Sequence, residues 1–174
     1  MYSKLLDLTM NQGKGKAVIE GLKHCSSNLV FIQDSDLEYD PSDIINFIQK
    51  MEETDADLIM GSRFISEERS VLNFWHMIGN KAISFIFNLL NNTTFTDIYC
   101  CYLCFKKELL LTQKLRTYGF EQHAEILCKV IKKGKKFFEV PTNYNGRTRE
   151  EGKKIKFYHI FPVLFRIVIE RIIP

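Results

Sequence analysis

The stretch FIQDSDLEYDP (residues 31–41) changes abruptly from apolar to acidic. It closes an apolar run of strand length and places four acids within seven residues. Pro41 is favoured in the first turn of a helix, and Asp40 before it is a typical N-cap, so a helix is predicted to begin here. Asp34 and Asp36 precede this helix start and need another explanation.

Two interpretations of Asp34 and Asp36 remain open on these residues alone. Two carboxylates one residue apart can approach a single divalent cation, a hard ion that prefers oxygen ligands and often also binds substrate phosphates. In open α/β sheets ligands bind beyond the carboxyl ends of strands, where this pair is expected to lie. The alternative is an ordinary acidic turn, because D-x-D triplets are common and acids stabilise a helix start through the helix dipole.

Outward from this stretch, segments with a helical period alternate with short apolar runs of strand length. Helices are expected over residues 16–24, 41–53, 71–91, 120–132 and 157–173, and strands over residues 28–33, 56–61, 102–105 and 137–140. This alternation predicts an α/β domain with a mostly parallel sheet flanked by helices. The chain of 174 residues, 45% of them hydrophobic, is long enough for one such domain with its own core.

Charge and cysteine content limit the classes of partner. The net charge of +3 is far below that of a nucleic-acid binder, so no nucleic-acid partner is expected. Residues 129–156 nevertheless carry ten Lys or Arg against three Glu, which favours an anionic partner for this part of the chain. The five cysteines include one C-x-x-C pair, Cys101 and Cys104, without a second pair or histidines at zinc spacing. Reduced thiols are therefore expected.

Three further motifs would suit an anionic ligand. NQGKGKA (residues 11–17) can offer backbone amides and an ammonium at a helix N-terminus. GSRF (residues 61–64) places Arg63 at the end of a predicted strand, along the same sheet edge as Asp34. NGRTREEGKKI (residues 145–155) is a basic loop before the last helix. Plainer alternatives remain open for each: a solvated turn, an Arg–Asp surface pair and a solvated charged loop.

Taken together and in this order, the motifs resemble those of the family 2 glycosyltransferases, in particular the polyprenyl-phosphate sugar transferases of the dolichol-phosphate mannosyltransferase type. The resemblance spans nearly all of the chain, and its most specific parts are the acidic stretch ending in EYDP and the sequence EGKKI. The matching motifs are NQGKG (11–15), DSDLEYDP (34–41), GSRF (61–64), TD (96–97) with CY (101–102), GFE (119–121), EVP (139–141), YNGR (144–147) and EGKKI (151–155).

The resemblance implies a GT-A fold, the Rossmann-like fold of enzymes that use nucleotide-diphospho-sugars. It implies a GDP- or UDP-sugar donor whose diphosphate is bridged by Mg²⁺ or Mn²⁺ to Asp34 and Asp36, with Glu38 as a further metal ligand. The implied acceptor is a polyprenyl phosphate, dolichyl or undecaprenyl, and one direct displacement would invert the anomeric configuration. The implied reaction is therefore metal-dependent glycosyl transfer to a lipid phosphate.

Further residues take roles by the same resemblance. Asp97 and Arg63 are the implied catalytic residues. Asp97 would orient the acceptor or the sugar, with a general-base role as the alternative, and Arg63 would bind the lipid phosphate or the donor diphosphate. The implied contacts to the donor diphosphate, its metal or the lipid phosphate come from Asn11, Gly13, Lys14, Asp34, Asp36, Arg147, Lys153 and Lys154.

The expected organisation is a partial GT-A domain over residues 1–156 and an amphipathic helix over residues 157–174. The last stretch contains one histidine and three charged residues, which make it a poor membrane-spanning helix. A helix that lies on the membrane surface fits better. The implied location is the cytoplasm, at the cytoplasmic face of the membrane.

Relatives open the domain with two further strand–helix units, and this chain begins after them. A domain truncated at its N-terminus, with an exposed sheet edge, is therefore expected, and such an edge favours self-association or a partner subunit. Two alternatives to the glycosyltransferase remain. One is a non-catalytic remnant or module of the same fold that binds lipid headgroups or a partner. The other is a sugar nucleotidyltransferase, which should show an N-terminal glycine-rich loop and has no use for EGKKI.

Overall fold

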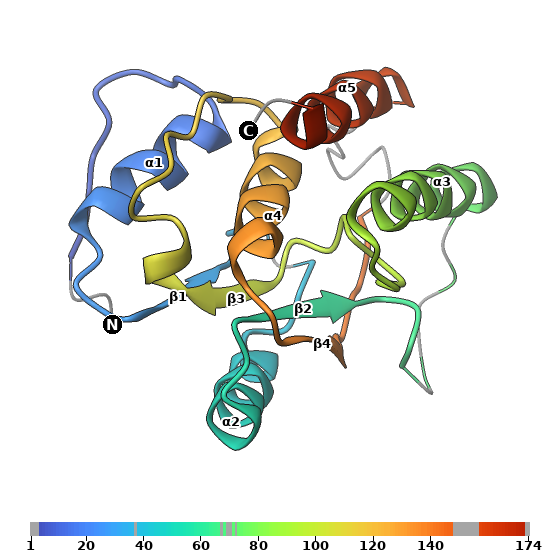
Figure 1. The fold of residues 1–174 in the computed structure, drawn as a ribbon, viewed down its shortest axis with the longest axis horizontal. Coiled ribbons are helices and arrows are strands. Elements are labelled where there is room, and N and C mark those ends of the chain that lie inside the picture. Colours follow the sequence, from blue (N-terminus) through green and yellow to red (C-terminus); the bar gives the residue numbers. More distant parts are fainter. Residues whose placement is uncertain are drawn as a thin grey trace.

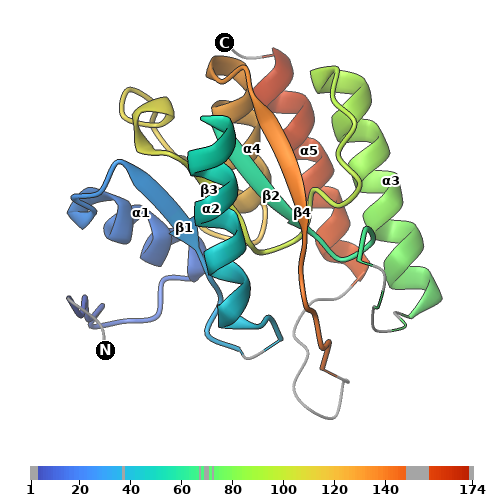
Figure 2. The ribbon, with the colours of Figure 1, turned by 90° about the horizontal axis from the view of Figure 1, so that it is seen from below.

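The computed structural model describes residues 4–36, 38–66, 68, 71, 73–147 and 157–172. In this part of the chain four strands form one sheet, and helices cover both of its faces (Figure 1, Figure 2). The strands are β1 (Leu29–Ile32), β2 (Leu58–Ser62), β3 (Leu103–Lys106) and β4 (Phe137–Pro141). The helices are α1 (Lys14–His24), α2 (Ile44–Thr54), α3 (Phe74–Asn91), α4 (Gln122–Lys133) and α5 (Ile160–Ile172), with short 3-10 turns η1 (Pro41–Asp43), η2 (Lys107–Leu109) and η3 (Phe157–His159).

The strands lie in the order β1-β3-β2-β4. β2 and β4 are parallel neighbours, whereas β3 lies between β1 and β2 and is antiparallel to both. The predicted α/β class is confirmed, but the sheet is mixed and the expected mostly parallel pairing is corrected. The reason is the connection through α3, which brings the chain back to the edge where β2 ended. β3 therefore starts at that edge and runs in the opposite direction, while β1, β2 and β4 all run the same way.

Alternating side chains of the strands fill two cores, one on each face of the sheet. Val30 and Ile32 of β1 belong to the larger core, which α3, α4 and α5 complete. Phe31, between them, packs edge-on against Phe47 of α2 in the smaller core, with ring centroids 5.1 Å apart. Figure 1 shows α2 on one face of the sheet and α1, α3, α4 and α5 on the other.

The carboxyl ends of β1, β2 and β4 and the start of β3 meet at one edge of the sheet. The acidic stretch follows β1 at this edge, and its predicted helix start is confirmed. Asp40 accepts a hydrogen bond from the backbone N–H of Ser42 at 2.9 Å, and Pro41 opens η1 before α2. The sequence predicts that the last strand stops before Pro141, but Pro141 is its final residue, paired with Ser62. An edge strand tolerates proline because the missing N–H is not needed in the ladder.

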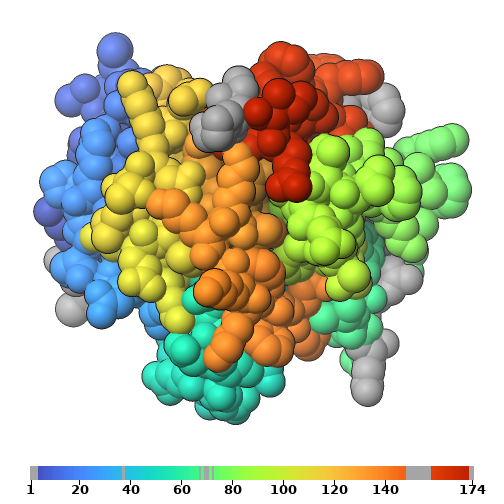
Figure 3. Space-filling view, viewed as in Figure 1, coloured from blue at the N-terminus to red at the C-terminus, as the bar shows by residue number. Residues whose placement is uncertain are grey.

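α5 packs against α3 and α4 with two of its three charged side chains, Arg166 and Glu170, turned inward. Arg166 and Glu170 are buried together with Val163 and Ile167, whereas Phe165 on the outer side is 68% exposed. A helix is present where the amphipathic helix was expected, but two of its three charged side chains lie against the protein. Figure 3 shows α5 and α3 next to each other on one face of the molecule. No helix within the described ranges has both the length and the apolar character needed to cross a membrane.

Candidate active site

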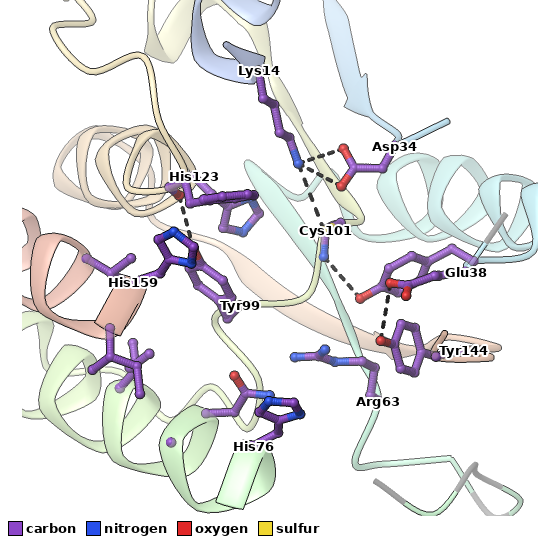
Figure 4. A pocket seen from close by; sticks show the side chains of 18 of the residues that line it. Lys14, Asp34, Glu38, Arg63, His76, Tyr99, Cys101, His123, Tyr144 and His159 are labelled. Atoms are coloured by element: carbon purple, nitrogen blue, oxygen red, sulfur yellow. Dashed lines mark hydrogen bonds and ion pairs between the residues drawn. The ribbon is translucent and has the colours of Figure 1, made fainter. Parts of the chain in front are cut away.

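A cavity of about 460 Å³ lies at the edge where the strand ends meet. The start of α1, the turns after β1 and β2, the segment before β3 and the loop after β4 supply its polar wall (Figure 4). α3, α4 and α5 supply a more apolar wall, with side chains such as Ile83, Ile126 and Val163. The fold thus gathers at one place residues that lie far apart in the sequence.

Lys14, the first residue of α1, reaches Asp34 in the turn after β1. Its Nζ lies 2.6 Å from Oδ1 and 2.8 Å from Oδ2 of Asp34, and 4.0 Å from Sγ of Cys101. Burial tends to raise the pKa of Asp34, but the Lys14 ammonium and a hydrogen bond from Cys101 hold it below its ordinary value. Asp34 is therefore ionised at neutral pH and presents carboxylate oxygens to the cavity.

Arg147, in the loop after β4, binds the other two acids of the turn. Its Nη2 lies 2.9 Å from Oδ2 of Asp36, and its backbone N–H donates to Oε1 of Glu38 at 2.9 Å. Tyr144 donates its hydroxyl hydrogen to Oε2 of Glu38 at 3.3 Å. Asp36 also accepts the backbone N–H of Glu38 at 3.3 Å, which closes the turn. The turn therefore carries three carboxylates, and the two cationic side chains Lys14 and Arg147 pair with them.

Arg63, which follows β2, forms a two-pronged pair with Asp97. Its Nε lies 2.7 Å from Oδ2 and its Nη2 2.8 Å from Oδ1, and its backbone N–H also donates to Asp97 at 3.1 Å. Asp97 is fully buried, and Glu139 of β4 holds it by accepting the backbone N–H groups of Thr96 and Asp97. Burial opposes the charge on Arg63, but Asp97 keeps the pKa of Arg63 well above its ordinary range. GSRF therefore supplies an Arg–Asp pair, as in its plainer interpretation, but a buried one at the cavity wall.

The structure brings most of the predicted residues together. The predicted residues that line the cavity are Lys14, Asp34, Glu38, Arg63 and Arg147. Asp36 joins them through its ion pair with Arg147. The expectation that Arg63 shares a sheet edge with the acidic turn is confirmed, because both follow strands that run the same way.

Other predicted residues lie elsewhere. The side-chain oxygen of Asn11 accepts a hydrogen bond from the backbone N–H of Gly13 at 3.0 Å. Gly13 precedes α1 and has a φ of 89°. Neither residue lines the cavity. Asp97 lies behind Arg63, and its catalytic role stays a prediction. Lys153 and Lys154 fall outside the described residues.

His123 is a cavity residue that sequence reasoning missed. It is the second residue of α4, and its ring meets the ring of Tyr99 edge-on with centroids 6.1 Å apart. Its spacing is a usable signal, because His123, Ile126, Leu127 and Val130 form a helical stripe at i, i+3, i+4 and i+7. A histidine at the first position of an otherwise apolar stripe indicates a polar group at the end of a buried helix.

Comparison with known proteins identifies the family. Residues 3–111 match the profile of glycosyl transferase family 2. The chain belongs to this family. It is 28% identical over 170 residues to the dolichol-phosphate mannosyltransferase of Pyrococcus furiosus, covering 94% of this chain and 46% of that protein. It is 29% identical over 136 residues to an uncharacterized protein of Methanocaldococcus jannaschii, covering 74% of this chain and 58% of that protein.

Solved structures confirm the GT-A class of the fold. The glucosyl-3-phosphoglycerate synthase of Mycobacterium tuberculosis, in complex with Mn²⁺, UDP and phosphoglyceric acid, matches with a TM-score of 0.67 at 16% identity. The match covers 96% of this family 2 chain and 57% of that chain. The chain thus spans less than two thirds of the length of the relatives named here.

Proposed function

We propose that the chain carries the metal and donor-diphosphate site of a glycosyltransferase that transfers a sugar from a nucleotide-sugar to a polyprenyl phosphate with inversion. The observation that carries this proposal is the acidic turn after β1, where Asp34, Asp36 and Glu38 meet Lys14 and Arg147 beside the cavity. The relative from Pyrococcus furiosus is named a dolichol-phosphate mannosyltransferase, which supports this acceptor class.

The carboxylates of the turn fit a divalent cation in kind. Mg²⁺ and Mn²⁺ prefer hard oxygen ligands and usually keep waters or substrate phosphates among them. Within the described ranges no group of three His, Cys, Asp or Glu could hold a metal by itself, so Asp34 and Asp36 would share it with the donor diphosphate. When bound, the metal supplies Lewis-acid stabilisation of the leaving nucleoside diphosphate. The solved synthase complex contains Mn²⁺ together with UDP, which supports this pairing.

The cationic side chains of the site act on the same developing charge. Lys14 and Arg147 lie beside the turn, where they can neutralise a departing diphosphate. Arg63 lines the cavity, and its contacts with Asp97 fix the direction of its guanidinium. An acceptor phosphate oxygen is already anionic, so its attack needs positioning more than a base. On this proposal Asp97 orients Arg63, and Arg63 binds the acceptor phosphate.

An apolar surface beside the cavity supports a lipid acceptor over a soluble one such as phosphoglycerate. α5 exposes Phe161, Phe165 and Ile172 by 64%, 68% and 73%, and the neighbouring α3 exposes Trp75 and Phe85 by 69% and 68%. Such side chains insert at the boundary between headgroups and acyl chains. The proposal therefore includes attachment at the cytoplasmic membrane face, with α5 resting on the bilayer.

A calorimetric experiment tests the donor and metal site. UDP, GDP, UDP-glucose and GDP-mannose are titrated into the chain with MnCl₂, and at least one pair of nucleotide and nucleotide-sugar is expected to bind. Asp36→Asn should weaken that binding at least about tenfold through loss of a charged ligand. The matched control is Asp40→Asn, the same change four residues away, because asparagine caps a helix as well as aspartate does. Binding by no nucleotide, or equal binding by Asp36→Asn and wild type, refutes this site.

A transfer assay tests the acceptor. Radiolabelled sugar from UDP-glucose or GDP-mannose is offered with a short polyprenyl phosphate in detergent, and in parallel with 3-phosphoglycerate. The expected product is an organic-soluble sugar phosphate formed only with the polyprenyl phosphate. Transfer to phosphoglycerate alone would overturn the lipid acceptor. Nucleotide binding without transfer to either would favour the non-catalytic module of the same fold.

A further inference from the structure

One buried polar atom in the cavity lacks a partner. Nε2 of His123 is buried, and no described residue donates or accepts a hydrogen bond there. Figure 4 shows the imidazole in the same cavity as the Lys14–Asp34 pair and close to Tyr99. An unsatisfied buried polar atom destabilises the fold, and a ligand can remove that cost by supplying the missing hydrogen bond.

The surroundings of His123 select the kind of ligand group. Four charged groups act on the ring, Lys14, Asp34, Arg63 and Asp97, and burial together with the Lys14 ammonium lowers the pKa of His123 to about 4. The imidazole is therefore neutral at pH 7 and offers no charge to a phosphate. No cluster of His, Cys, Asp or Glu in the described part of the chain is suited to a metal at this place. A hydroxyl fits best, because it can donate to or accept from a neutral imidazole.

The position of His123 indicates which part of the substrate supplies that hydroxyl. On the proposed function, Asp34 and Lys14 lie at the donor diphosphate, and the group attached to that diphosphate is the sugar. His123 lies within electrostatic range of both residues and at the same cavity wall as Ile126. On that arrangement the sugar, which carries several hydroxyls, would be the part of the donor that faces this wall.

We propose that Nε2 of His123 hydrogen-bonds a hydroxyl of the transferred sugar and that His123 is a specificity-determining residue for the donor. This inference rests on the proposed function. It assigns to α4 a role in recognising the sugar, in addition to the diphosphate contacts made from α1 and the turn after β1.

Two substitutions separate the hydrogen bond from the shape of the ring. His123→Phe keeps a ring of similar size without nitrogen, and His123→Gln keeps a polar group at a position close to that of Nε2. The ligands are UDP, UDP-glucose, GDP and GDP-mannose with MnCl₂, measured by calorimetry. His123→Phe should lower the affinity for the bound nucleotide-sugar about tenfold and leave the affinity for its free nucleoside diphosphate within about twofold. His123→Gln should retain most of the affinity for the sugar.

A measurement on the wild-type chain guards against a variant that fails to fold. With diamagnetic Mg²⁺ in place of Mn²⁺, the ¹⁵N resonance of His123 Nε2 should shift further when the nucleotide-sugar binds than when the free nucleoside diphosphate binds, because only the sugar supplies the hydrogen bond. Shifts of equal size with the free diphosphate and with the nucleotide-sugar, or equal losses of diphosphate and sugar affinity in His123→Phe, overturn the inference and leave the proposed function intact. If the wild-type chain binds neither class of ligand, the proposed function fails and this inference fails with it.

Discussion

Replacing Arg166 by methionine tests the buried charge network that attaches α5 to α4. Nη2 of Arg166 lies 2.6 Å from Oε1 of Glu125 and also contacts Glu170, and Nζ of Lys129 lies 3.0 Å from Oε2 of Glu170. All four side chains are buried, with Glu125 completely so. Two carboxylates and two cations balance, so the network is neutral as it stands.

The magnitude follows from this balance. Without Arg166, two buried carboxylates share the one ammonium of Lys129, and one negative charge is left uncompensated. Leaving such a charge costs about 3–5 kcal/mol, a large part of the roughly 5–15 kcal/mol that stabilises a typical domain. Arg166→Met with Glu170→Met removes one charge of each sign and should cost less than Arg166→Met alone. Arg171→Met, on the exposed side of the same helix, should change stability by less than about 0.5 kcal/mol.

Urea unfolding followed by circular dichroism measures these differences, with an unchanged slope as the sign that only stability has altered. A loss below about 1 kcal/mol for Arg166→Met would contradict a buried, coupled network. So would a double variant that is less stable than the single one. The result also concerns the site, because Ile160 and Val163 of α5 line the cavity and depend on this attachment.

Two further predictions concern α1 and α4. A Cβ at Gly15 would lie 2.6 Å from the backbone of Tyr118, so Gly15→Ala should destabilise the fold by about 1–3 kcal/mol. A Cβ at Gly21 would have no contact within 4 Å, so Gly21→Ala should stabilise the fold by about 0.5–1 kcal/mol. Thermal unfolding measures both changes. Burial and Lys14 lower the pKa of His123 from 6.5 to about 4 in the folded chain. As the pH falls, His123 is therefore protonated first in the unfolded chain. The folded state should lose stability between about pH 6.5 and 4. The loss from pH 7 to 4.5 should be about 2.5 kcal/mol larger in wild type than in His123→Phe, and equal slopes for the two proteins would contradict a neutral buried histidine.

Most helices and strands could be predicted from the sequence because their signals are local. Hydrophobic period and proline placement predict a strand over residues 28–33 and a helix after Asp40, and β1 and η1 lie there. The direction of β3 could not be predicted, because a short apolar run carries no information on which neighbour it pairs with. Its direction depends on where α3 returns the chain, which is a property of the packed fold.

The site shows the same limit. Arg63 and Asp34 could be placed at one edge, because strand ends in α/β sheets follow a general rule. The pairing of Arg63 with Asp97 could not be foreseen, since 34 residues separate them and β3 and β4 bring them together. The orientation of α5 could not be predicted either, because the same amphipathic pattern allows the polar side of the helix to face the solvent or the protein. Arg166 and Glu170 of α5 face the protein because they form ion pairs with Glu125 and Lys129 of α4.

The charge pattern of the acidic turn connects the structure to the proposed reaction. Asp34 is paired with Lys14, and Asp36 and Glu38 with Arg147, so three negative and two positive charges nearly cancel. A divalent cation alone would have to compete with both cations for the carboxylates. A nucleoside diphosphate that arrived with the cation would give Lys14 and Arg147 new anionic partners, and Asp34 and Asp36 would then be available to hold the metal. On the proposed function, this turn would therefore bind metal and diphosphate together.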